Sequence, residues 1–294
     1  MGGPDPRVLN LMLRMREALE AYPQARHFEG RIDDWIATTM RVEADGAMWM
    51  WRVLRVSGFV GVDIGTLVSA FQGQCDASGS ACEIVAEKLL LSAPQATGSA
   101  IERGRDMEPL IRTKARALLQ GKGDDAGMSV ISRGRGPTPW MLYAPDDVLV
   151  VDGRRWLLNY NCSLDLESEV QARERHSARL HQGRMVAMHN GLAVDVMAVA
   201  QWDYQSWRPV VFEIAHDAHV DEIIVAAGDH YWNECVLTGD LPECPAIAAD
   251  FALPRERSTA IAPVATKDLL ERAAPSPTET DEAPKPDVAS AMAA

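Results

Sequence analysis

The sequence predicts an α+β fold, in which a small mixed or antiparallel sheet is flanked by helices. Three observations lead to this prediction. Apolar residues recur at helical spacing through much of residues 6–120. Short apolar runs, typical of strands, replace this spacing at residues 140–163. The pattern then indicates a helix, two strands and a last helix, which ends at residue 239. Because helices and strands are largely segregated along the chain, an α+β class is favoured over alternating β-α units.

The predicted helices follow from amphipathic spacing and from residues that favour helix ends. Pro6 stands near the first position of the first helix, where proline is well tolerated. Gly121 and Gly123 are predicted to end a strongly amphipathic helix, and Asn190-Gly191 and Gly239 to end two later ones. The predicted helices cover about residues 6–19, 32–42, 62–72, 81–91, 103–120, 176–189 and 218–238.

The predicted strands lie between residues 139 and 217. "PWMLYAPDDVLVVDGRRWLLNYNCS" contains three apolar runs, and Asp152-Gly153 between the last two predicts a tight hairpin. Two further runs lie in residues 192–203 and 208–217. The last strand of the first group carries Asn159 and Asn161, which share one face because side chains at i and i+2 point the same way. Asparagine is depleted in strands, so the pair requires an explanation.

Composition limits the class of protein. The chain has 294 residues, 47% of them hydrophobic, and a formal net charge of −13. That charge argues against a general nucleic-acid coat protein and is compatible with a narrow positive channel. No apolar run is long enough to span a membrane and the N-terminus does not resemble a secretory signal, so we expect a cytoplasmic protein. The expected organisation is a helical extension (1–50), a main domain (51–250) and a disordered Pro/Ala/acidic tail (251–294).

Several short motifs occur in a recognisable order. They are Trp51 with Arg55, Asp63, Glu108-Pro109, Pro145-Asp146 before the hairpin, Cys162 after it, and Gln182 on the following helix. This order resembles the YqaJ-type viral recombinase family, which includes the phage lambda exonuclease and belongs to the PD-(D/E)XK superfamily of metal-dependent DNA nucleases. The resemblance covers roughly residues 51–242 and implies that residues 51–250 have a restriction-endonuclease-like core.

The resemblance also implies roles for these residues. Asp146 matches the main metal-binding carboxylate, Glu108 the helix glutamate that supports the metal, and Gln182 the first glutamine of a Gln-x-Gln motif. Arg55 matches a phosphate-contacting arginine, and Arg184 replaces the second glutamine as a further phosphate-binding candidate. The implied cofactor of an active enzyme is Mg²⁺ or Mn²⁺. The implied partners are double-stranded DNA ends, a single-strand annealing protein and further copies of the chain, as in the trimers of relatives.

The departures from the family pattern fall in the active site. Asn159 and Asn161 occupy the two catalytic positions of the Glu-x-Lys motif, Val62 replaces a phosphate-contacting serine, and Asp147 replaces a glycine. Magnesium sites are dominated by oxygen ligands, above all carboxylates. An Asn pair removes one anion and one cation while it conserves net charge, so we expect weak or absent hydrolysis. Restoring the pair, Asn159→Glu with Asn161→Lys, is expected to create or increase nuclease activity.

Alternatives remain open. An active exonuclease could draw a replacement carboxylate from Asp165, Glu167 or Glu169 and a cation from Arg154 or Arg155. A protein-interaction factor on the same fold is the third reading. Ordinary structural roles compete with functional ones: Arg103, Arg105 and Arg112 are expected at the surface, with a DNA channel as the alternative. The tryptophans are expected in the core rather than as base-stacking platforms, among them Trp51, Trp140, Trp156, Trp202, Trp207 and Trp232.

Overall fold

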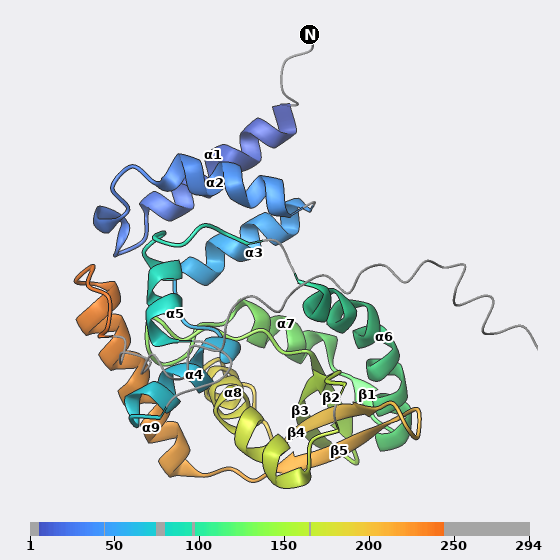
Figure 1. The fold of residues 1–294 in the computed structure, drawn as a ribbon. Coiled ribbons are helices and arrows are strands. Elements are labelled where there is room, and N and C mark those ends of the chain that lie inside the picture. Colours follow the sequence, from blue (N-terminus) through green and yellow to red (C-terminus); the bar gives the residue numbers. More distant parts are fainter. Residues whose placement is uncertain (1–5, 44, 75–79, 96–97, 165, 244–294) are drawn as a thin grey trace, which may run out of the picture. The chain divides into compact units, whose positions relative to one another are not determined.

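A computed structural model gives the fold and describes residues 6–43, 45–74, 80–95, 98–164 and 166–243. Helices dominate the first half: α1 (Pro6–Glu20), α2 (Ile32–Val42), α3 (Gly46–Val56), α4 (Gly61–Phe71), α5 (Ala81–Lys88), α6 (Ser99–Leu119) and α7 (Asp125–Arg133). The sheet and its helices follow: β1 (Lys122–Gly123), β2 (Asp147–Val151), β3 (Arg154–Asn161), α8 (Glu169–His189), β4 (Val196–Asp203), β5 (Arg208–Ile214) and α9 (Ala218–Tyr231) (Figure 1). By its contacts Met1–Cys244 forms one unit. The predicted tail, 251–294, lies outside the described residues.

The five strands form one sheet in sequence order, β1-β2-β3-β4-β5. Only the β3–β4 pair is parallel, and the other three pairs are antiparallel. The β2–β3 connection is the predicted hairpin: Asp152 has φ 49° and Gly153 φ 77°, the two positive values that a type I′ turn requires. The α+β class, with a small mixed sheet flanked by helices, is confirmed.

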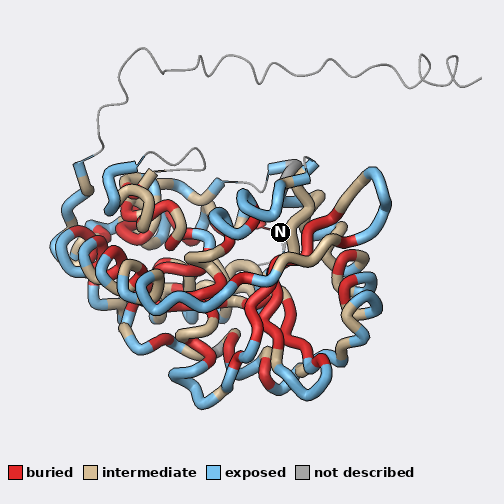
Figure 2. The backbone as a smooth tube through the Cα atoms, turned by 90° about the horizontal axis from the view of Figure 1, so that it is seen from below, coloured by how far each residue is buried: buried red, intermediate tan, exposed pale blue. Residues whose placement is uncertain are grey.

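Helices cover both faces of the sheet, α6 on one and α8 on the other (Figure 1). The α6 side has a core that includes Ile111, Trp156 and Leu158, and the α8 side a core that includes Leu157 and Leu180. Successive residues of β3 therefore point into different cores, as the pleat of a strand demands. Burial is concentrated in the strands and the helix faces that cover them (Figure 2).

The three N-terminal helices have a core of their own. Met15 and Leu19 of α1, Trp35 of α2 and Val53 of α3 pack together there. Helix α3 crosses the predicted boundary between residues 50 and 51. The division into an extension and a main domain stays a prediction. Within the described residues, no helix combines the length and the apolar composition needed to cross a membrane.

Four details differ from expectation. Residues 140–143 form isolated bridges rather than a predicted strand, because Leu142 bonds back to Phe59, which lies far away in sequence. Helices α3 and α7 were not predicted. The left-handed residue at the end of α6 is Gln120, with φ 52°, and not a glycine. Trp207, at the β4–β5 turn, is 60% exposed although a core position was expected, because the turn holds it at the tip of the hairpin.

Candidate functional site

Asp146 is held at the start of the β2–β3 hairpin. The antiparallel register pairs Asp147 with Leu158, which places Asp146 beside the C-terminal half of β3. The backbone N–H of Tyr160 donates to Asp146 Oδ2 over 2.8 Å. The hairpin therefore fixes the carboxylate next to the strand that carries the two asparagines.

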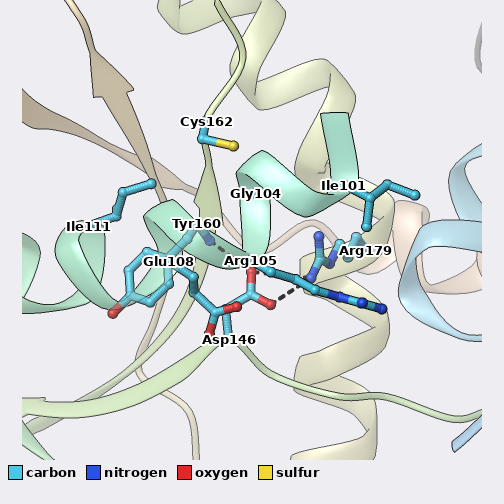
Figure 3. A pocket seen from close by; sticks show the side chains of 9 residues that line it. All are labelled: Ile101, Gly104, Arg105, Glu108, Ile111, Asp146, Tyr160, Cys162 and Arg179. Atoms are coloured by element: carbon cyan, nitrogen blue, oxygen red, sulfur yellow. Dashed lines mark hydrogen bonds and ion pairs between the residues drawn. The ribbon is translucent and has the colours of Figure 1, made fainter. Parts of the chain in front are cut away.

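Glu108 approaches the same place from α6. Arg112, one turn further along α6, donates to the Glu108 carboxylate and also to the backbone oxygen of Asp146, over 2.8 Å in the second case. Both acids line a pocket of about 270 Å³. Figure 3 shows their side chains converging, with Arg105 and Arg179 beside them; the other lining residues are Ile101, Gly104, Ile111, Tyr160 and Cys162.

Arg179 of α8 makes the closest ion pair with Asp146. Its Nη2 donates to both carboxylate oxygens, over 3.0 and 3.2 Å. The two side chains are only 21% and 20% exposed. Burial lowers the pKa of Arg179, but Asp146 and Tyr143 together raise it by more, so the guanidinium stays charged. The pair is a partly desolvated, hydrogen-bonded salt bridge rather than a surface contact.

The electrostatic balance of the pocket is slightly positive. Burial raises the pKa of Glu108, and the Asp146 carboxylate raises it further against the opposing effect of Arg112. Arg105 is exposed at the pocket and makes no ion pair with a described carboxylate. Arg112, which contacts Glu108 without lining the pocket, joins Arg105 and Arg179, so three arginines face two acids. The cluster therefore carries one more positive charge than negative charges when all five groups are ionised. Such a cluster suits an oxyanion with bidentate geometry, such as a phosphate group.

The two asparagines do not line this pocket. Asn159 is fully buried and its Oδ1 accepts a 2.9 Å hydrogen bond from the Tyr143 hydroxyl. Asn161 Oδ1 accepts from the backbone N–H of Ser163 over 3.2 Å. The Nδ2 groups of both find no partner among the described residues. Asn159 thus belongs to a polar network under the pocket, and Asn161 to the end of the strand.

Three further predicted residues have structural partners elsewhere. Gln182 is fully buried, and its Nε2 donates to the backbone oxygens of Phe59 and Leu142 over 2.8 and 2.5 Å. Arg55 pairs with Asp63 over 3.0 Å, in a cluster that also contains the buried Lys88. Arg184 lies 3.8 Å from Asp221. None of the three lines the pocket with Asp146 and Glu108.

The replacement groups considered from the sequence are also engaged elsewhere. Glu167 pairs with Arg175, Glu169 with Arg173, and Arg155 with Asp124. Arg154 starts β3 at an exposed position beside the hairpin turn. Asp165 lies outside the described residues. The described members of this set are therefore not lining residues of the pocket.

The donor set does not fit a divalent metal. Mg²⁺ favours octahedral oxygen ligation that includes free carboxylate oxygens. Here Arg179 contacts both oxygens of Asp146, and Arg112 contacts Glu108. Among the described residues no group of three or more His, Cys, Asp or Glu side chains is arranged to hold a metal ion. A metal in this pocket would have to displace arginines from both acids.

Sequence reasoning missed Arg179 and Tyr143. Tyr143 lay in a presumed strand, and no spacing rule connects it to Asn159. Arg179 did carry a signal: it is one turn before Gly183 and one turn after His176, both buried positions of α8. An arginine on the buried face of a helix needs an acidic partner, so this position could have been singled out.

Comparisons with known proteins give structural likenesses alone. No family model matches the chain, and no curated protein matches it in sequence. Two solved structures resemble it: LHK-Exo in complex with dAMP, with 11% identity and a TM-score of 0.49, and LHK-Exo, an alkaline exonuclease from Laribacter hongkongensis, with 12% identity and 0.47. Each likeness covers 65% of this chain and 92% of the other. At this identity it does not extend to individual site residues.

Proposed function

We propose that this chain is a nuclease-fold protein of the lambda-exonuclease type that binds double-stranded DNA ends and has weak or no phosphodiester hydrolysis. One observation carries the proposal: Arg179 donates to both carboxylate oxygens of Asp146, and the neighbouring strand β3 adds no second carboxylate to the pocket. The motif order, and the convergence of Glu108 and Asp146 on one pocket, support the restriction-endonuclease-like core.

The chemistry of the pocket supports binding over cleavage. Hydrolysis of a phosphodiester in this superfamily depends on a metal that positions water and neutralises developing charge. An arginine is always protonated and cannot act as a base, but it is a good bidentate ligand for phosphate. Arg105 and Arg179 could therefore hold a phosphate group of DNA while neither activates water. The resemblance of the motif order to the lambda-exonuclease type extends the proposal to a single-strand annealing protein as partner and to a homo-trimer. We also propose a cytoplasmic location.

The test uses a fluorescent 5′-phosphorylated duplex and the full chain. We expect a gel shift at low salt that persists in EDTA, with no digestion in Mg²⁺ or Mn²⁺. Arg105→Ala is expected to weaken end binding several-fold, since it removes a phosphate contact. Arg173→Ala is the matched control, because Arg173 is half exposed and pairs with Glu169 on the outer face of α8. Equal binding by both variants would contradict a role for the pocket.

An active Mg²⁺- or Mn²⁺-dependent 5′–3′ exonuclease is the second candidate. It is favoured by the convergence of Glu108 and Asp146 on one pocket, since two neighbouring carboxylates could share a cation. Burial raises the pKa of Glu108, and the Asp146 carboxylate raises it further. Robust metal-dependent digestion that disappears in Asp146→Ala would establish it.

The third candidate is a protein-interaction factor, which is favoured by the acidic net charge of −13. This candidate predicts no DNA binding at low salt.

A further inference from the structure

The Asp146 carboxylate already has hydrogen-bond donors from the chain itself, one of them the charged Arg179. Arg179 Nη2 contacts both oxygens, and the Tyr160 N–H contacts Oδ2 over 2.8 Å. The guanidinium of Arg112 reaches the backbone oxygen of the same residue. A carboxylate with this set of donors gains little from a metal ion, because the metal would have to replace hydrogen bonds that are already made.

Arg179 is also fixed in place by packing. It lies beside Tyr143, a buried hydroxyl whose pKa is raised by burial and which therefore stays neutral. The N-terminus of α4 lies against both: a Cβ at Gly61 would come within 2.7 Å of Arg179 Cγ and 2.9 Å of Tyr143 Cε2. A larger residue at position 61 would push the arginine away, so the close approach depends on glycine. The arginine is thus a built-in part of the core rather than a mobile surface side chain.

The neutral partner on β3 completes the charge balance. Tyr143 donates to Asn159 Oδ1, and Arg179 donates to Asp146. These four side chains together carry one negative and one positive charge. A glutamate at position 159 would add a second buried negative charge next to a neutral phenol. A divalent cation beside Arg179 would add positive charge against positive charge. Both changes are unfavourable at low effective dielectric.

We infer that Arg179 is a resident cation that neutralises Asp146 in place of a divalent metal, so that the pocket binds a phosphate group through guanidinium groups alone. This rests on the proposed function and deepens it, since it states why the pocket that binds the phosphate group takes no divalent metal. Asp146 is then a positioning residue for Arg179 and not a metal ligand.

The first experiment uses the unmodified full chain. Mn²⁺ broadens the amide resonances of residues next to its ligands, and the Tyr160 amide reports on Asp146 because the two are hydrogen-bonded. The Gln205 amide is the internal reference, because it donates to the exposed carboxylate of Asp203 over 2.8 Å. We expect Mn²⁺ to broaden Tyr160 no more than Gln205. Selective broadening of Tyr160 would overturn the inference.

The second experiment removes the arginine. Mn²⁺ binding is measured from the loss of the free-ion resonance in electron paramagnetic resonance. We expect Arg179→Met to gain a site at least about tenfold tighter than any in the wild type, a difference of about 1.4 kcal/mol. The gain should disappear in Arg179→Met with Asp146→Asn. Arg175→Met is the matched control, because Arg175 lies on the same helix with 65% of its side chain exposed.

A folded Arg179→Met chain that gains no Mn²⁺ site would also overturn the inference. Should this variant fail to fold, the wild-type broadening experiment decides the question alone. The two proposals fail separately: loss of DNA-end binding in EDTA contradicts the proposed function, whereas an Mn²⁺ site at Asp146 in the wild type contradicts the role of Arg179.

Discussion

The Tyr143 hydroxyl donates a 2.9 Å hydrogen bond to the side-chain oxygen of Asn159, and both residues are buried. This contact joins the segment before β2 to the strand that carries the two asparagines. It also changes what a restoring mutation is expected to do, because position 159 faces a neutral phenol and not an open metal site.

We expect Asn159→Glu with Asn161→Lys to leave the chain inactive and less stable by several kcal/mol, since it puts a carboxylate at a fully buried position that faces the neutral Tyr143 hydroxyl. Adding Arg179→Gln frees Asp146 and is expected to permit Mg²⁺-dependent digestion. Urea unfolding and digestion of a linear duplex measure the two effects, and Asn161→Lys alone is the control. Robust digestion by the double variant without the change at Arg179 would show that the sequence-based expectation was sufficient.

Asp147 is expected to be a strong structural anchor. It is fully buried, accepts two hydrogen bonds from Arg116 over 2.8 and 2.6 Å, and accepts a third from the Tyr160 hydroxyl over 2.5 Å. Arg116→Met leaves this carboxylate without its cation and should lower the free energy of unfolding by about 3–5 kcal/mol. The exposed ion pair of Arg173 with Glu169 gives the comparison. Arg173→Met should lower the free energy of unfolding by at most about 0.5 kcal/mol. Similar losses in both variants would contradict the buried-anchor interpretation.

His176 should make stability depend on pH. Its pKa is lowered to about 4, first by burial and then by Arg179 and Arg175. An unfolded histidine titrates near about 6.5. Between these values the unfolded chain binds a proton that the folded chain excludes. The contribution of the neutral His176 to the free energy of unfolding is therefore complete above about pH 6.5. It falls by about 2–3 kcal/mol as the pH falls towards 4.

The check is the free energy of unfolding in urea at about pH 7 and about pH 4.5. We expect His176→Gln to show a smaller loss on acidification than the wild type, because glutamine does not titrate in this window. His219→Gln is the control, since its side chain is 74% exposed. Identical pH profiles for the wild type and His176→Gln would rule out His176 as the source.

Gln120 should be a site where stability can be gained. It holds φ 52° at the end of α6, a conformation that glycine adopts without strain, and its side chain is exposed. Gln120→Gly is expected to raise the free energy of unfolding by about 0.5–1 kcal/mol. Gln120→Ala retains the Cβ and should give no such gain. A larger gain with alanine than with glycine would indicate that strain at this residue is not the cause.

The sequence predicted much of the fold because the signals involved are local. Residues only a few positions apart indicate the Asp152-Gly153 hairpin and the end of α8 before Gly191. They also indicate where strands β2 to β5 lie along the chain. The strand predicted at residues 140–143 was wrong because the contacts of this segment are not local. The backbone groups of Trp140 and Leu142 bond to Phe59, more than eighty residues earlier, and no local pattern reports that partner.

The candidate site was predicted in part. The sequence placed Asp146, Glu108 and the two asparagines near one another along the hairpin and α6, and the structure brings the two acids into one pocket. Gln182 and Arg184 were expected there as well, but their partners are Phe59 and Leu142 in one case and Asp221 in the other. Helical spacing gives the face of α8 on which a side chain lies and not the depth to which that face packs.

By itself, then, the sequence determined the fold class, the hairpin and the presence of two asparagines, Asn159 and Asn161, two residues apart on one strand. Only the tertiary structure decided that Arg179, 33 residues beyond Asp146, supplies the cation at the carboxylate. The reason is physical. Secondary structure follows from contacts along the chain. The charge balance of the pocket depends instead on which side chains come within a few ångströms of each other when α8 packs against the sheet and α4 packs against α8.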